Sequence, residues 1–161
     1  MMSNSIPPVS IASSDLRPLK QVAVQAVNSR HPIGQFLLSE LDRATVYDPS
    51  AVPSRSVRLN EWVTFRADDG EPLESRVLVL PGDFRNNQMH LSVLSPLGAA
   101  LVGLHAGARI RYAGIDGVKH TATVENLDPP AGVVSLLQRR DMKNFARANE
   151  ENPDPSGPTA A

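Results

Sequence analysis

The segment Leu91–Tyr112, LSVLSPLGAALVGLHAGARIRY, changes its pattern twice along its length. It begins with the alternation of a strand, meets Ser95 and Pro96, and then becomes small and apolar. Serine is a preferred N-cap residue, and proline is favoured at the first position of a helix. Gly103 and Gly107 can adopt the positive φ angles that let a chain leave a helix. The segment therefore predicts a strand, a sharp corner, a short helix and a second strand.

The predicted short helix has one apolar face, formed by Leu97, Leu101 and Leu104. A face with this spacing must be covered, and the nearest surface is the sheet formed by the flanking strands. The Ser95-Pro96 corner would then stand exposed on a rigid support. All of these residues would also be expected in a plain scaffold, so the pattern alone defines a shape and not a function.

Alternation with a period of two continues on both sides of this unit and predicts a small sheet. The run 75–81, SRVLVLP, is almost continuously apolar, as is typical of a central strand covered on both faces. Asp69 and Gly70 predict the tip of a turn. The predicted strands are 57–65, 75–81, 90–94, 109–113 and 118–127.

The region upstream predicts a short antiparallel helical hairpin over residues 14–46, coiled-coil-like in form. Asp15 is the expected N-cap of the first helix, which places Pro18 in the first turn. The second helix is expected from Ile33. Neither helix is long enough to be stable alone, so the hairpin should pack on the body that follows. The residues at its tip are Asn28, Ser29, Arg30 and His31.

The remaining segments complete the predicted organisation. Residues 1–13 are expected to be a flexible lead-in, and residues 51–128 a single sheet-containing domain. Residues 131–149 predict a C-terminal helix, and 150–161 have the composition of a disordered tail. The helix carries basic residues that predict either a solvated face or a second contact, to a protein or to nucleic acid. These residues are Arg139, Arg140, Lys143 and Arg147.

Composition excludes several classes of function. The chain has no cysteine, which rules out disulfides and thiolate chemistry and fits a reducing cytoplasm. A formal net charge of −1 gives no general attraction to nucleic acid or to anionic lipid. No apolar run is long enough to span a bilayer, so we expect a cytoplasmic protein without membrane contact.

Three stretches resemble the regulator-of-nucleoside-diphosphate-kinase family, an offshoot of the bacterial transcript-cleavage factors of the GreA/GreB type. They are SELDRA at 39–44, VRLNEWVTF at 57–65 and LSVLSPLGAALVGLHAGARI at 91–110. The resemblance implies an α+β fold, with a short helical hairpin followed by an FKBP-like domain of about five strands, mainly antiparallel, and one short helix. This order agrees with the pattern of the sequence.

The resemblance also implies a partner. In the GreA/GreB-type factors the C-terminal domain docks on the rim of the secondary channel of RNA polymerase, and the Ser-Pro corner is part of that contact. The matching positions here are Ser95 and Pro96. The preceding residue is usually acidic in the cleavage factors, whereas this chain has Leu94. We therefore expect Leu94, Ser95 and Pro96 to contact the polymerase.

The expected function is non-enzymatic regulation of transcription by a monomer without metal or cofactor. The cleavage factors carry carboxylates to the polymerase active centre on a long coiled coil, whereas this hairpin is short and its tip lacks a carboxylate. Glu40 and Asp42 lie near the base of the second helix, as solvated charges or salt-bridge partners. The four histidines show no spacing typical of a metal site.

Three alternatives remain open at this point. One is transcript-cleavage stimulation, and another is a nucleic-acid-binding accessory that acts through the C-terminal helix. A third is prolyl isomerisation, which would need a pocket with aromatic walls. The aromatic candidates are Trp62, Phe65, Phe84 and Tyr112.

Overall fold

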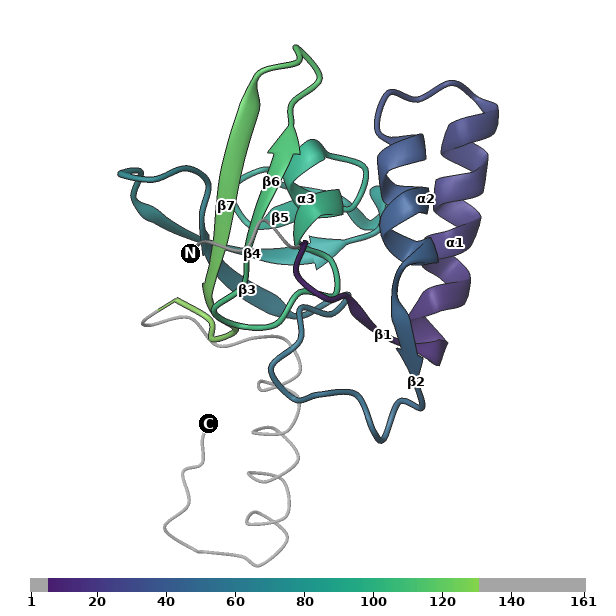
Figure 1. The fold of residues 1–161 in the computed structure, drawn as a ribbon, viewed down its shortest axis with the longest axis horizontal. Helices are drawn as coiled ribbons and strands as arrows, with labels where there is room; N and C mark the ends of the chain where they lie inside the picture. Colours follow the sequence, from purple (N-terminus) through teal and green to yellow (C-terminus); the bar gives the residue numbers. More distant parts are fainter. Residues whose placement is uncertain (1–5, 131–161) are drawn as a thin grey trace, which may run out of the picture. The chain divides into compact units, whose positions relative to one another are not determined.

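The computed structural model describes residues 6–130, and within them it contains two sheets and three α-helices. The larger sheet has the strand order β5-β4-β3-β7-β6, with all neighbours antiparallel except β4 and β5 (Figure 1). The predicted α+β fold is confirmed. The elements are β1 (Ser10–Ala12), α1 (Ser13–Asn28), α2 (Gly34–Asp42), β2 (Thr45–Tyr47), β3 (Trp62–Arg66), β4 (Leu73–Val79), the 3-10 turn η1 (Pro81–Asp83), β5 (His90–Ser92), α3 (Pro96–Leu101), β6 (Arg109–Ala113) and β7 (Lys119–Asn126).

The core lies between α3 and one face of the five-stranded sheet (Figure 1). Leu101 and Leu104 are fully buried there, but the predicted apolar face is corrected, because α3 ends at Leu101, Leu104 follows the helix and Leu97 is only partly buried. Val63 and Phe65 of β3 supply the sheet side of the core, and Ile110 of β6 joins them. Burial of several large apolar side chains, each contributing about 1.5–3 kcal/mol, holds α3 on the sheet.

Two strand predictions are corrected. The central strand is β3, not the apolar run 75–81, because β4 lies one position nearer the edge. Only Leu78 and Val79 of β4 are buried, and Leu73 is 47% exposed. The predicted strand 57–65 also begins later than expected, at Trp62.

The residues before β3 explain the second correction. Val57 is buried and exchanges backbone hydrogen bonds with the residues that follow α3, donating to Leu104 and accepting from Gly103. Asn60 then adopts a left-handed φ of 65°, which turns the chain into β3. The alternating apolar residues of 57–65 therefore lie in two buried segments joined by a bend, and not in one straight strand.

The predicted flexible lead-in is wrong at its C-terminal end. Residues 10–12 form β1, which pairs in parallel with β2, and Val9 and Ile11 are buried in the main core. The Ser10 N–H donates to the carbonyl of Gly103 at 2.8 Å. Burial of two apolar side chains and pairing with a strand beyond the hairpin hold this segment, and its local sequence shows neither the burial nor the pairing.

The helical hairpin is confirmed, but both its ends differ from the prediction. The predicted hairpin runs to residue 46, whereas α2 ends at Asp42 and Thr45–Tyr47 form β2. α1 begins at Ser13 with Ala12 in the N-cap position, so Asp15 is not the cap. Asp15 lies in the first turn instead, and its carboxylate accepts from Arg58 at 3.4 Å. A carboxylate in the first turn still favours the helix dipole.

The hairpin packs on the body, as its length requires. Leu19 of α1 and Leu37 of α2 belong to the same buried cluster as the sheet. Gly34 permits the close approach of the helices, because a Cβ there would lie 2.7 Å from the backbone nitrogen of Val27. No helix within residues 6–130 is long and apolar enough to cross a membrane. The predicted C-terminal helix (131–149) and tail (150–161) lie outside the described residues, together with the four basic residues named above.

Candidate partner-binding site

The Ser95-Pro96 corner is built from a dense set of local hydrogen bonds. Ser95 caps α3, since its Oγ accepts the N–H of Gly98 at 3.0 Å. The same hydroxyl donates to the carbonyl of Ser92 at 2.7 Å. The Ser92 Oγ in turn accepts the N–H of Leu94 at 3.1 Å. The predicted cap and first-turn proline are confirmed. The hydrogen bond between Ser95 and Ser92, three residues earlier, links the start of α3 to the end of β5.

These bonds change the expected role of Ser95. Leu94, Ser95 and Pro96 are all partly exposed, so the corner is not hidden in the interior. The Ser95 hydroxyl, however, uses its proton and one lone pair within the corner itself. The sequence could not distinguish a serine that faces a partner from one that shapes the support. In the structure Ser95 shapes the corner, and the side chains left partly exposed beside it are those of its neighbours Leu94 and Pro96.

Replacing Ser95 by alanine is expected to lower the free energy of unfolding by about 1–2 kcal/mol, since it removes the cap of α3. Urea unfolding followed by circular dichroism measures this loss. Ser39→Ala is the matched control, because the Ser39 hydroxyl bonds only the carbonyl of Phe36 on an exposed helix face. Equal stability of the two variants would contradict a capping role for Ser95.

Beside the corner lies a groove of about 610 Å³, which we call the corner groove. Its apolar lining includes Leu91 and Leu97, while Phe84 adds an aromatic side chain that is 38% exposed. The loop that follows β4 closes one side. His31 from the hairpin tip and His90 from β5 also line it. The corner, the sheet edge and the hairpin tip therefore share one surface, which the sequence did not predict.

The hairpin tip is held in place by its own backbone. Ser29 is the C-cap of α1, and Arg30 follows with a left-handed φ of 61°. The next amide, that of His31, donates to the carbonyl of Ala26 at 2.8 Å and closes the helix end. Asn28 and Ser29 lie at the helix end as expected, but the left-handed position is taken by Arg30, where glycine is the usual residue. This turn directs His31 toward the corner groove.

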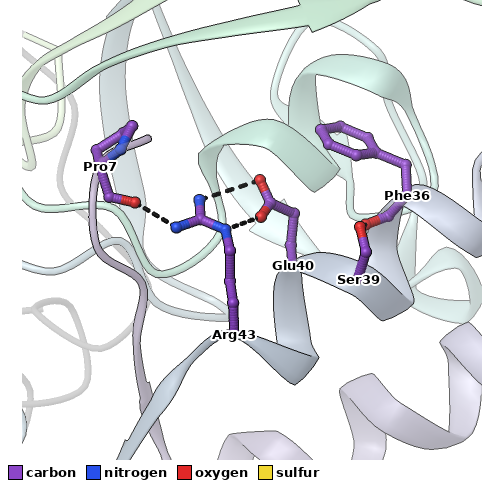
Figure 2. Close-up of polar contacts among 5 residues, drawn as sticks. All are labelled: Pro7, Phe36, Ser39, Glu40 and Arg43. Carbon is purple, nitrogen blue, oxygen red and sulfur yellow. Dashed lines mark hydrogen bonds and ion pairs between the residues drawn. The ribbon is translucent and has the colours of Figure 1, made fainter. Parts of the chain in front are cut away.

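The acidic residues of α2 separate into two kinds. Asp42 is exposed, whereas Glu40 is only 5% exposed and pairs with Arg43. Figure 2 shows the Arg43 guanidinium between the Glu40 carboxylate and the carbonyl of Pro7. The salt-bridge alternative thus holds for Glu40, which fastens the N-terminal segment to the base of the hairpin. Neither carboxylate lies at the hairpin tip.

A second polar cluster lies away from the corner, at the turn between β3 and β4. Asp68 accepts hydrogen bonds from the Thr121 backbone N–H at 3.0 Å and from His120 Nδ1 at 2.8 Å. The pKa of Asp68 is lowered, mainly by the hydrogen bond from Thr121 and to a smaller extent by the one from His120. Tyr112 stacks on His120. These residues join a turn to two strands, and none of them lines the corner groove.

The aromatic candidates for an isomerase pocket do not gather in one place. Trp62 and Phe65 are buried, Tyr112 packs on His120, and only Phe65 and Phe84 line the corner groove. Within residues 6–130 there is also no group of three histidine or acidic side chains arranged to hold a metal ion.

Known proteins are similar to this chain in sequence and in fold. Residues 52–129 match the family model described as transcription elongation factor, GreA/GreB, C-terminal. The chain is 36% identical over 109 residues to the regulator of nucleoside diphosphate kinase of Escherichia coli (strain K12), across 67% of this chain and 79% of the relative. It is 35% identical over 99 residues to the transcription elongation factor GreB of Pseudomonas aeruginosa, across 60% of this chain and 57% of the relative.

A solved structure gives the same result. The prokaryotic transcription elongation factor GreA/GreB from Nitrosomonas europaea superimposes with a TM-score of 0.60 at 28% identity, covering 75% of this chain and 99% of that one. The family model and these relatives thus place the five-stranded α+β domain in the class of GreA/GreB-type transcription factors. Within that class, the chain belongs to the family of the regulator of nucleoside diphosphate kinase. The family predicted from the sequence is confirmed.

Proposed function

We propose that this chain is a non-enzymatic transcription regulator of the bacterial cytoplasm that binds RNA polymerase at the rim of its secondary channel. The observation that carries the proposal is the corner at Leu94–Pro96, held rigid by Ser95 and open to solvent beside a groove. Partly exposed apolar residues beside polar ones, as at this corner and groove, also occur in protein interfaces. Family membership supports RNA polymerase as the partner.

The hairpin supports a regulator without cleavage activity. α1 has 16 residues, so at 1.5 Å per residue it is about 24 Å long. Its tip carries Asn28, Ser29, Arg30 and His31, none of which is a carboxylate. A bound monomer would stand at the channel entrance and compete with longer factors, without bringing an acidic group to the active centre.

Binding to core polymerase tests the proposal. Immobilised protein should retain purified bacterial core polymerase at low salt. The variant Phe84→Ala/Pro96→Ala should lower the affinity at least tenfold, because Pro96 belongs to the corner and Phe84 lines the groove beside it. Ile115→Ala is the matched control, since Ile115 is 66% exposed and does not line the groove. Absence of retention by the unmodified chain, or equal loss in the control, would overturn the docking model.

The competing functions have separate readouts. A stalled-complex assay should show no faster transcript cleavage on addition of the protein, and a proline-peptide assay no faster isomerisation. Removal of the residues after Pro130 should leave polymerase retention unchanged. Retention lost on that deletion would instead favour an accessory that acts through Arg139, Arg140, Lys143 and Arg147.

A further inference from the structure

Two histidines reach the corner groove from distant parts of the chain, and both hold the same tautomer. His31 Nδ1 accepts the backbone N–H of Ile33 at 3.1 Å. His90 Nδ1 accepts the backbone N–H of Arg85 at 3.0 Å. A neutral imidazole that accepts at Nδ1 carries its proton on Nε2. Each ring therefore keeps an Nε2–H donor, and within residues 6–130 neither donor has a hydrogen-bond partner.

This tautomer sets the chemistry that the pair can recognise. Coordination of a metal by Nε2 would need the lone pair at the position that the proton occupies. Two N–H donors instead require an acceptor, and a buried donor without one costs about 1–3 kcal/mol once a partner covers it. A protein that closes over the corner groove must therefore supply acceptor oxygens at this place.

The charges around the groove favour an acidic acceptor over a neutral one. The Glu74 carboxylate is already paired with Arg76 at 2.9 Å, and Arg76 also donates to the carbonyl of Asn87. Arg30 adjoins His31 in the sequence, and Arg85 lies in the loop that holds His90, both of them exposed. Of the carboxylates in that loop, Asp83 is exposed and two residues from Arg85. Besides the paired Glu74 and Arg76, the surface near the imidazoles thus carries two arginines against one carboxylate, an excess of one positive charge.

The rest of the groove is apolar. Phe84, Leu91, Leu94 and Leu97 line it, and its volume of about 610 Å³ accepts a large side chain with part of its main chain. From these contacts we propose that the corner groove binds an acidic-apolar segment of the partner protein, in which a leucine-like side chain enters the groove and an adjacent carboxylate accepts from Nε2 of His31 and of His90. The inference rests on the proposed docking function and specifies its partner sequence.

Short peptides test this chemistry without polymerase. The probes are N-acetylated, C-amidated Gly-Leu-Glu-Gly and Gly-Leu-Gln-Gly, added to the full-length ¹⁵N-labelled protein and followed by NMR at the histidine side chains and at the amide of Leu94. We expect the glutamate peptide to shift these signals with a dissociation constant at least fivefold lower than that of the glutamine peptide. Equal responses, or no response to either peptide, would overturn the inference.

Variants of the full chain separate the inference from the docking proposal. His31→Phe/His90→Phe keeps two rings but removes both donors, and should weaken binding to core polymerase about tenfold or more. His31→Gln/His90→Gln keeps an N–H donor at each position and should recover part of that loss. Polymerase binding that is intact in the phenylalanine variant would refute the histidine pair and leave docking standing, whereas no binding by the unmodified chain would refute docking itself.

Discussion

Replacing Gly98 by alanine should unfold the corner. A Cβ at this position would lie 1.9 Å from the carbonyl oxygen of Ser92 and 2.7 Å from its carbon, both of them backbone atoms. β5 and α3 would have to separate by more than an ångström, which breaks the bonds that Ser95 makes to Ser92 and to Gly98. We expect the free energy of unfolding to fall by about 3 kcal/mol, and Tm to fall by roughly 10 °C.

Thermal unfolding by calorimetry measures the effect, with Gly82→Ala as the matched control. A Cβ at Gly82 would meet no heavy atom within 4 Å, and its φ is not positive, so this variant should keep the stability of the unmodified chain to within about 0.5 kcal/mol. If Gly98→Ala has the same Tm as Gly82→Ala, then β5 and α3 are not in the close contact described above. Polymerase affinity of the folded fraction then tests whether the proposed docking depends on the corner.

The corner shows what local sequence can predict. The cap by Ser95, the first-turn position of Pro96 and the left-handed Gly103 and Gly107 all depend on neighbours within a few residues, and all are as expected. The same holds for Ile110 buried on β6 between exposed arginines. Short-range rules apply here because the chain needs no distant partner to satisfy them.

The errors arise where a distant segment completes a local pattern. Val9 and Ile11 follow a polar, proline-containing stretch that is typical of a flexible end. Hydrogen bonds to β2 and to Gly103 nevertheless hold their segment in place. The apolar run of β4 suggested a central strand, but the strand order depends on a β3–β7 pairing that spans the whole domain. The corner groove was missed for the same reason, since His31 and Ser95 meet only after the hairpin packs on the body.

Replacing Arg43 by methionine should lower the free energy of unfolding by more than the replacement of an exposed arginine does. The reason is that Glu40 would keep its charge in a buried position. Arg43 bonds both oxygens of that carboxylate and also donates to the carbonyl of Pro7 (Figure 2). Removal of one partner of a buried pair leaves an uncompensated charge. Arg43 itself is partly exposed, so we expect a loss of about 2–4 kcal/mol in the free energy of unfolding.

The double variant Glu40→Gln/Arg43→Met distinguishes this cause from lost packing. A neutral glutamine removes the buried charge, so the double variant should be more stable than Arg43→Met alone, by urea unfolding at pH 7. Arg111→Met on the exposed face of β6 is the control and should change stability by less than about 0.5 kcal/mol. Because Arg43 also holds Pro7, hydrogen exchange at the amide of Thr45, which donates to Val9, should accelerate in Arg43→Met. A double variant no more stable than the single one would show that the guanidinium acts on the N-terminal segment alone.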